Sequence, residues 1–230
     1  MSVKLVSFTE PSSLMEGDFN GNFKIISPEE LIVYIARVSN PSNQMNMETA
    51  PKLINYLIKH KHWSPFEFVD VTFEIVTRRS IAAQILRHKS FSFQEFSQRY
   101  STATEIQPVE LRKQGKTNRQ SSEEPVPDFA LERDIEQHFA NSKMLYDKLI
   151  KQGISRETAR DVLPLSTETT MYMKGNLRSW ITYLNVRLHK TTQKEHRQIA
   201  VDIKNIIVDK FPIISSALNN FENFNDEHYI

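Results

Sequence analysis

The sequence predicts an α+β fold in which an antiparallel-type sheet is packed with several long helices in a single domain. Residues 68–76 alternate between apolar and polar types, as expected for a half-buried strand. Helical periodicity is clearest over residues 128–152 and 176–189. Because a few strands occur beside segregated helices, the α+β class is favoured.

The first quarter of the chain carries clear start and stop signals. Residues 3–8 alternate weakly and predict a first strand. Ser27 is followed by a proline and two glutamates, which is typical of a helix start, and this helix should run to about Val38. A turn cluster at residues 40–43 separates it from a second predicted helix over residues 51–60.

The strand at residues 68–76 is followed by a predicted helix over residues 78–88. Residues 110–127 carry a glycine, two prolines and many polar side chains, so we expect a flexible loop within one domain that spans residues 1–230. The buried face of the strand should consist of Val69, Val71, Phe73 and Ile75. The later elements are a helix over 128–152 ended by Gly153, a helix from Ser155 to Pro164, a strand over 167–173, and helices over 176–189 and 192–210.

Composition places the chain among globular proteins. Of its 230 residues, 39% are hydrophobic and 25% are charged, which argues against intrinsic disorder. The net charge of +1 argues against a dedicated nucleic-acid binder, and no apolar run is long enough to span a membrane. The absence of cysteine excludes disulfides and a thiol nucleophile, and it fits a reducing compartment. We therefore expect a cytoplasmic protein without nucleic-acid or membrane partners.

The most informative segment is the run RHKSFSFQEFSQRY at residues 87–100, which is expected to begin at a helix end and to cross a loop. Arginine offers forked donors to a phosphate, and serine hydroxyls add further donors. Basic residues at a helix end are individually explained by the helix dipole, but that does not explain Ser97, Arg99 and Tyr100 further on. Together these residues predict a site for a phosphorylated small molecule.

The run resembles the signature of the flavin-dependent thymidylate synthases, an Arg-His-Arg triplet followed by spaced Ser, Asn, Ser, Arg and Tyr. Lys89 stands in place of the third-position Arg, and Gln94 stands in place of Asn. Further blocks that resemble the family are HWSPFE at residues 62–67, ARDVLP at 159–164, and NLR with NVR within 176–187. The matching residues of the run are Arg87, His88, Ser92, Ser97, Arg99 and Tyr100.

The resemblance implies which residues contact FAD and the nucleotide. Ser97 and Arg99 suit a 5′-phosphate, and Glu95 suits a ribose hydroxyl. Glu67 would help frame the flavin, and Thr182 stands where many relatives have Asn. The implied flavin contacts are His62, Ser64, Arg87, His88, Lys89, Glu95, Asn176, Arg178 and Thr182. The implied nucleotide contacts are Gln84, Ile85, Leu86, Arg87, Glu95, Phe96, Ser97, Gln98, Arg99, Arg160 and Arg187.

The family methylates dUMP at carbon five to give dTMP. The resemblance implies methylenetetrahydrofolate as the carbon donor, reduced FAD as the hydride source and NADPH as the reductant of the flavin. Because the chain has no cysteine, a positioned cation must activate the uracil instead of a thiolate. Arg187 is the catalytic candidate, since it would stabilise negative charge at the ring nitrogen between the two carbonyls. The family's sites form between subunits of a homotetramer, and we expect the same arrangement.

Two alternatives remain open at the level of sequence. The chain is a noncatalytic nucleotide- and flavin-binding module if the departures at Lys89, Gln94, Thr182 and Thr191 mark lost chemistry. It is a single-stranded RNA binder if the aromatic side chains of the run are stacking platforms. His60 and His62 have no third ligand placed by spacing, so no metal site is predicted. The aromatic side chains in question are Phe91, Phe93, Phe96 and Tyr100.

Overall fold

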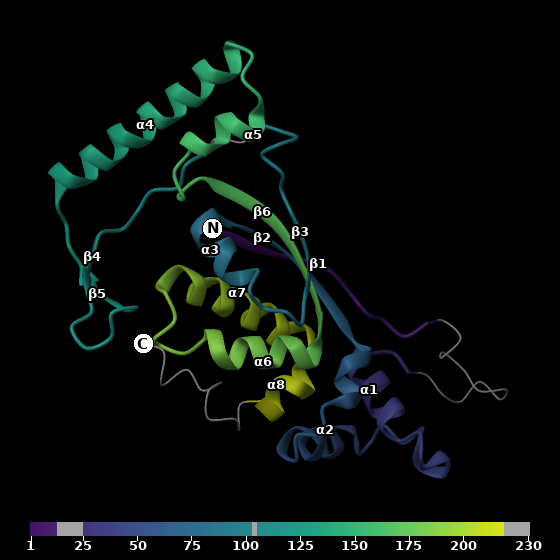
Figure 1. Cartoon of the computed structure of the whole chain (residues 1–230). Coiled ribbons are helices and arrows are strands. Elements are labelled where there is room, and N and C mark those ends of the chain that lie inside the picture. The colour runs from purple at the N-terminus through teal and green to yellow at the C-terminus, as the bar shows by residue number, and fades with distance from the viewer. Residues whose placement is uncertain (13–24, 103–104, 219–230) are drawn as a thin grey trace. The chain divides into compact units, whose positions relative to one another are not determined.

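The computed structural model describes residues 1–12, 25–102 and 105–218 (Figure 1). The strands are β1 (Ser2–Phe8), β2 (Asp70–Arg78), β3 (Ser92–Glu95), β4 (Arg112–Gln114), β5 (Ser122–Pro125) and β6 (Glu168–Asn176). The helices are α1 (Pro28–Ala36), α2 (Ala50–Lys59), α3 (Arg79–Ile85), α4 (Phe129–Lys151), α5 (Arg156–Ala159), α6 (Leu177–Arg187), α7 (Lys194–Lys210) and α8 (Pro212–Leu218). Short 3₁₀ turns lie at Pro41–Asn43, Ser64–Phe68 and Arg160–Val162.

Four strands form one antiparallel sheet in the order β1-β2-β6-β3, and β4 pairs with β5 separately. This arrangement confirms the predicted α+β class. The chain divides into two compact units, and that residues 1–230 act as one domain stays a prediction. Unit 1 consists of Met1–Ser2, Ile75–Lys89 and Phe93–Tyr172. Unit 2 consists of Val3–Glu74, Ser90–Ser92 and Met173–Ile230.

Helix α1 of unit 2 begins with the predicted signals. The hydroxyl of Ser27 accepts from the N–H of Glu30 at 3.1 Å, and the Glu30 carboxylate accepts from the N–H of Ser27 at 3.2 Å. These two bonds form a capping box. Glu29, in the same turn, is buried and accepts a hydrogen bond from the N–H of Ile214 in α8. Helix α8, which was not predicted, packs on α2 and α7.

Strand β2 and helix α6 build the core of unit 2. The ring of Trp180 lies edge-on to Phe73 with centroids 4.9 Å apart, and its indole N–H donates to the carbonyl of Val71 at 3.1 Å. Asn176 caps α6, because its Oδ1 accepts from the N–H of Ser179 at 2.9 Å. The helical periodicity predicted over residues 176–189 agrees with the structure, because the side chains on its apolar face are all buried: Leu177, Trp180, Ile181, Leu184 and Leu188.

Helix α4 of unit 1 is long (Figure 1). Most of its side chains are exposed. Asp128 caps it by accepting from two backbone N–H groups at 3.1 Å, and Gly153 follows with a φ of 81°, as predicted for a C-terminal glycine. No helix among the described residues is both long and apolar enough to cross a membrane. Tyr146 of α4 is buried. The exposed apolar side chains of this helix are Phe129, Leu131, Met144 and Leu145.

Further stretches differ from the sequence prediction, including the expected helix from Ser155 to Pro164, where α5 ends at Ala159 and a 3₁₀ turn follows. Part of the run at residues 87–100 forms β3, where a loop was expected, and the pairing with β6 continues as Phe96 N–H donates to the carbonyl of Thr170 at 2.9 Å. The predicted loop at residues 110–127 contains β4 and β5, whose pairing supplies backbone bonds that a loop lacks, while its flexibility stays a prediction. Helix α3 ends at Ile85, earlier than predicted.

Candidate active site

The run at residues 87–100 is held by main-chain bonds near both ends. At its start, the N–H of His88 donates to the carbonyl of Ile85 at 3.1 Å and closes the last turn of α3. At its end, the N–H groups of Tyr100 and Ser101 both donate to the carbonyl of Ser97 at 3.1 Å. Strand β3 lies between these turns. The segment that carries the predicted phosphate ligands therefore has a defined backbone.

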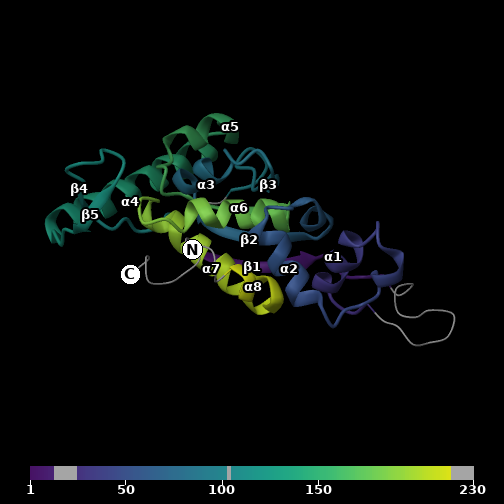
Figure 2. The ribbon, with the colours of Figure 1, turned by 90° about the horizontal axis from the view of Figure 1, so that it is seen from below.

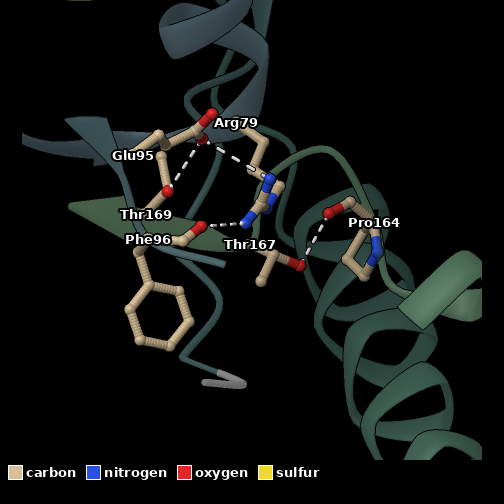
Figure 3. A network of polar contacts seen from close by, with 6 residues as sticks. All are labelled: Arg79, Glu95, Phe96, Pro164, Thr167 and Thr169. Carbon is tan, nitrogen blue, oxygen red and sulfur yellow. Dashed lines mark hydrogen bonds and ion pairs between the residues drawn. The ribbon is translucent and has the colours of Figure 1, made fainter. Parts of the chain in front are cut away.

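Glu95 is the centre of a polar network in unit 1 (Figure 3). Its Oε1 accepts from the hydroxyl of Thr169 at 2.9 Å and lies 3.4 Å from Nη1 of Arg79. Nη2 of Arg79 also donates to the carbonyl of Phe96 at 3.2 Å. Because Oε1 takes both contacts, Oε2 remains for a ligand hydroxyl, as the predicted role of Glu95 requires.

Arg79 was not predicted as a site residue. Its N–H donates to the carbonyl of Thr167 at 3.0 Å, and the Thr167 hydroxyl donates to the carbonyl of Pro164 at 2.7 Å (Figure 3). Burial lowers the pKa of Arg79, the charge of Glu95 opposes this, and the positive charge of Arg160 lowers the pKa further. Arg160 therefore acts on the same network. A cation in the first turn of a helix opposes the helix dipole, and this was the sequence signal that could have marked Arg79.

A cavity of about 480 Å³ opens beside the end of the run. Its lining includes the predicted phosphate ligands Ser97 and Arg99, together with Ser155 and Arg156 from the start of α5, which were not predicted. Nη2 of Arg99 lies 3.2 Å from Oε2 of Glu157, and both side chains are more than half exposed. Two guanidinium groups and two hydroxyls suit a phosphate group.

A second cavity, of about 560 Å³, shares Ser97 and Tyr100 with the first. Gln98, the neighbour of Ser97, is 5% exposed, and its Nε2 has no hydrogen-bond partner among the described residues. Leaving a buried donor unsatisfied costs about 1–3 kcal/mol, but Gln98 is not among the residues that line either cavity. The second cavity is lined by Gln94, Glu95, Phe96, Ser97, Tyr100, Ser101, Thr170 and Tyr172.

The remaining predicted nucleotide contacts of unit 1 lie around the end of α3. Ile85 is fully buried, so it belongs to the core and is not exposed to a ligand in this structure, contrary to the predicted nucleotide contact. Gln84, Leu86 and His88 are partly exposed. Two cations of the triplet, Arg87 and Lys89, are exposed and suit contact with an anionic ligand.

Three predicted flavin contacts lie on α6 in unit 2. Asn176 uses its side-chain oxygen as the helix cap, which leaves its two amide N–H donors for a ligand. Arg178 forms an ion pair with Glu67, the residue expected to frame the flavin. The hydroxyl of Thr182 donates to the carbonyl of Arg178 at 2.9 Å, so this hydroxyl can only accept from a ligand. These donors and acceptors fit the polar groups of FAD.

His62, another predicted flavin contact, belongs to an exposed aromatic cluster of unit 2. Its ring centroid lies 5.7 Å from that of Tyr56 and 6.1 Å from that of His60. Lys61 has a φ of 58°, which is uncommon for a residue with a side chain. Ser64 begins the following 3₁₀ turn and is exposed. Within residues 1–12, 25–102 and 105–218, no cluster of three His, Asp or Glu residues could hold a metal ion.

Arg187, the catalytic candidate, is the last residue of α6 and is partly exposed. Tyr183, one turn earlier, is 1% exposed, and its hydroxyl lies 3.0 Å from Nε2 of the fully buried His196. Burial raises the pKa of Tyr183, and the positive charge of Arg187 opposes this shift. The helix that ends at Arg187 therefore also carries one member of a buried polar pair that the sequence did not reveal.

The aromatic side chains of the run do not form one exposed surface. Phe91 lies with its ring centroid 4.6 Å from that of Trp180 and 5.9 Å from that of Tyr183, within unit 2. Tyr100 is 88% exposed. Because bases stack on exposed aromatic faces, the packing of Phe91 does not favour the RNA-binding alternative.

Comparison with known proteins assigns the family. The model of the Thy1 family, described as thymidylate synthase complementing protein, matches residues 24–213. The chain belongs to this family. It is 47% identical over 225 residues to the probable flavin-dependent thymidylate synthase of Paramecium bursaria Chlorella virus 1, covering 95% of this chain and 99% of that protein. It is 46% identical over 222 residues to the flavin-dependent thymidylate synthase of Synechocystis, with the same coverage. The predicted family is confirmed.

One solved structure has a similar fold and aligns with nearly the whole of this chain. The UMP/dUMP methylase PolB from Streptomyces cacaoi, bound with 5-Br dUMP, matches with a TM-score of 0.80 and 25% identity over 96% of each chain. The same protein bound with 5-Br UMP matches with a TM-score of 0.73, over 96% of this chain and 95% of that chain. The likeness supports the α+β fold independently of the sequence.

Proposed function

We propose that this family member is a flavin-dependent thymidylate synthase, which methylates dUMP to dTMP. Methylenetetrahydrofolate donates the carbon, and NADPH reduces the flavin. The observation that carries the proposal is the cavity at the end of the run, whose lining includes Ser97, Arg99 and Arg156. The names of the relatives, which include thymidylate synthases and a dUMP methylase, support the same reaction.

The nucleotide would be held by unit 1 through its phosphate and ribose. Arg99 and Ser97 bind the 5′-phosphate, and Arg156 adds a second cation to the same cavity. Glu95 accepts from a ribose hydroxyl, since Thr169 and Arg79 fix its carboxylate from the other side. Binding and orientation of the nucleotide are thus separate from the step at carbon five.

Arg187 would activate the uracil ring. Its guanidinium stabilises negative charge at the ring nitrogen between the two carbonyls, which makes carbon five more nucleophilic. The chain contains no cysteine, so no thiolate can add to carbon six. Reduced FAD, when bound, supplies the hydride. It would be held by His62, Ser64, Arg87, His88, Lys89, Glu95, Asn176, Arg178 and Thr182.

The enzyme would be a cytoplasmic homotetramer whose sites are shared between subunits. Apolar side chains on α4 are exposed to solvent, with Phe129 84% exposed and Met144 60% exposed. Burying them against another copy would be favourable, which supports association between subunits. Arg99→Ala and Arg187→Ala should then rescue one another in part when the two variants are mixed into one tetramer. Absence of any rescue would contradict shared sites.

The reaction is tested by the visible absorption spectrum of the purified protein under anaerobic conditions. We expect a flavin band that NADPH bleaches, faster with dUMP present, and dTMP formation once methylenetetrahydrofolate is added. A protein that binds FAD and dUMP but forms no dTMP would instead be the noncatalytic binding module. Failure to take up FAD at all would contradict the flavin assignment.

Matched variants test the phosphate assignment. Arg99→Ala removes a charge-assisted contact worth about 1.5–3 kcal/mol, so the Kd for dUMP should rise about 10- to 100-fold. Arg119→Ala removes an exposed cation from the segment between β4 and β5 and should leave the Kd unchanged. Equal effects of both changes would indicate a general charge effect and contradict a specific phosphate site.

A further inference from the structure

A buried hydrogen bond joins the last turns of α6 to the first turn of α7. The hydroxyl of Tyr183 lies 3.0 Å from Nε2 of His196, and these residues are 1% and 0% exposed. Burying a phenol and an imidazole is costly unless each finds a partner, whereas an apolar pair fills the same space without that cost. Core packing alone therefore does not explain why a tyrosine and a histidine are buried together here.

The bond lies next to the residue proposed to act on the uracil. Arg187 follows Tyr183 by four residues, so the two side chains lie on the same face of α6, one turn apart. The positive charge of Arg187 opposes the rise in the pKa of Tyr183 that burial causes. Arg187 ends α6, and the last turn of a helix is prone to fray because its carbonyls lack helical partners.

The ring of Tyr183 is fixed on its other sides by aromatic contacts. Its centroid lies 5.7 Å from that of Trp180 in an edge-on arrangement and 5.9 Å from that of Phe91. Phe91 fills the space over Gly175, where a Cβ would overlap its ring. The phenol therefore has one defined orientation, and its hydroxyl is directed to α7, which lies beside α6 (Figure 2).

We propose that Tyr183 and His196 are positioning residues for Arg187. Their hydrogen bond holds the last turn of α6 against the first turn of α7, and so keeps the guanidinium where the uracil binds. The inference rests on the role of Arg187 in the proposed function. A misplacement of about 1 Å at such a group can cost about 100-fold in rate, so a single buried bond is sufficient to matter.

Tyr183→Phe tests the bond with a minimal change, because it deletes the hydroxyl and keeps the ring. We expect kcat for dTMP formation to fall about 10- to 100-fold, while FAD content and NADPH oxidation without dUMP stay at the wild-type level. His196→Gln keeps an acceptor for the phenol and should retain more activity than His196→Leu, which removes it. Tyr146→Phe, the same deletion at an equally buried tyrosine of α4, is the control and should leave kcat unchanged.

A double-mutant cycle separates positioning from general stabilisation. If Tyr183 acts through Arg187, Tyr183→Phe should have no further effect on dTMP formation in an Arg187→Ala background. A loss of the same size in both backgrounds would indicate a merely structural role and overturn the inference. An unchanged kcat in Tyr183→Phe alone would also overturn it.

The same experiments distinguish failure of the inference from failure of the proposed function. If wild-type protein forms dTMP and Arg187→Ala forms it at a strongly reduced but measurable rate, the proposed function stands and the cycle decides the inference alone. If Arg187→Ala forms dTMP at the wild-type rate, the role of Arg187 is refuted and the inference falls with it. If wild-type protein neither binds nor methylates dUMP, the function itself is refuted, whatever Tyr183→Phe does to stability.

Discussion

Glu29 offers a direct test of how unit 2 is held together. Glu29 is 3% exposed, and its Oε1 accepts from the N–H of Ile214 at 2.7 Å in the first turn of α8. Burial raises the pKa of Glu29 from 4.5 to about 7, although the backbone hydrogen bonds from α8 favour the charged form. A raised pKa means that the folded state prefers the protonated carboxyl.

The magnitude follows from the size of this shift. At about 1.4 kcal/mol per pKa unit, a change from 4.5 to about 7 corresponds to an upper value of about 3 kcal/mol in the free energy of unfolding. The contribution is fully present below pH 4.5, where Glu29 is protonated in both states, and it is lost as the pH rises through about 7. Glu29→Gln keeps an acceptor for Ile214 without the charge, so it should match wild type at pH 4.5 and exceed it at pH 8.

Urea unfolding of wild type and Glu29→Gln between pH 4.5 and pH 8.5 is the assay. We expect the difference in unfolding free energy to grow with pH, towards about 3 kcal/mol. Glu29→Ala removes the acceptor at every pH and leaves the N–H of Ile214 without this partner, so it should cost about 1–3 kcal/mol relative to Glu29→Gln throughout. A difference between wild type and Glu29→Gln that stays constant with pH would refute the reasoning.

Three further changes test packing, capping and the nucleotide site. Gly175→Ala places a methyl group against the ring of Phe91, so urea unfolding should show a loss of about 1–3 kcal/mol; no loss would contradict this packing. Asn176→Ala deletes the cap of α6 and should cost about 0.5–2 kcal/mol, whereas the capping-competent Asn176→Asp should cost less. Thr169→Val frees the carboxylate of Glu95 and should raise KM for dUMP about 2- to 10-fold; an unchanged KM would show that the hydroxyl does not hold Glu95 for the ribose.

The sequence alone determined the elements whose signals are local. Ser27 caps its helix as predicted, and Gly153 takes the left-handed conformation after α4. The apolar arc of α6 also follows from periodicity, because a helix places every third or fourth side chain on one face. The run at residues 87–100 could also be identified from sequence, because its charged and hydroxyl side chains lie close together along the chain.

Only the tertiary structure decided the contacts that complete the site. Strand β3 is short and polar, and it forms because β6 supplies its hydrogen bonds. Thr169 meets Glu95 across 74 residues of chain, and Ile214 meets Glu29 across 185. The bond between Tyr183 and His196 likewise depends on how α7 packs on α6. Periodicity and capping act within a few residues, whereas these pairs exist only after distant segments have been packed together, so no local pattern announces them.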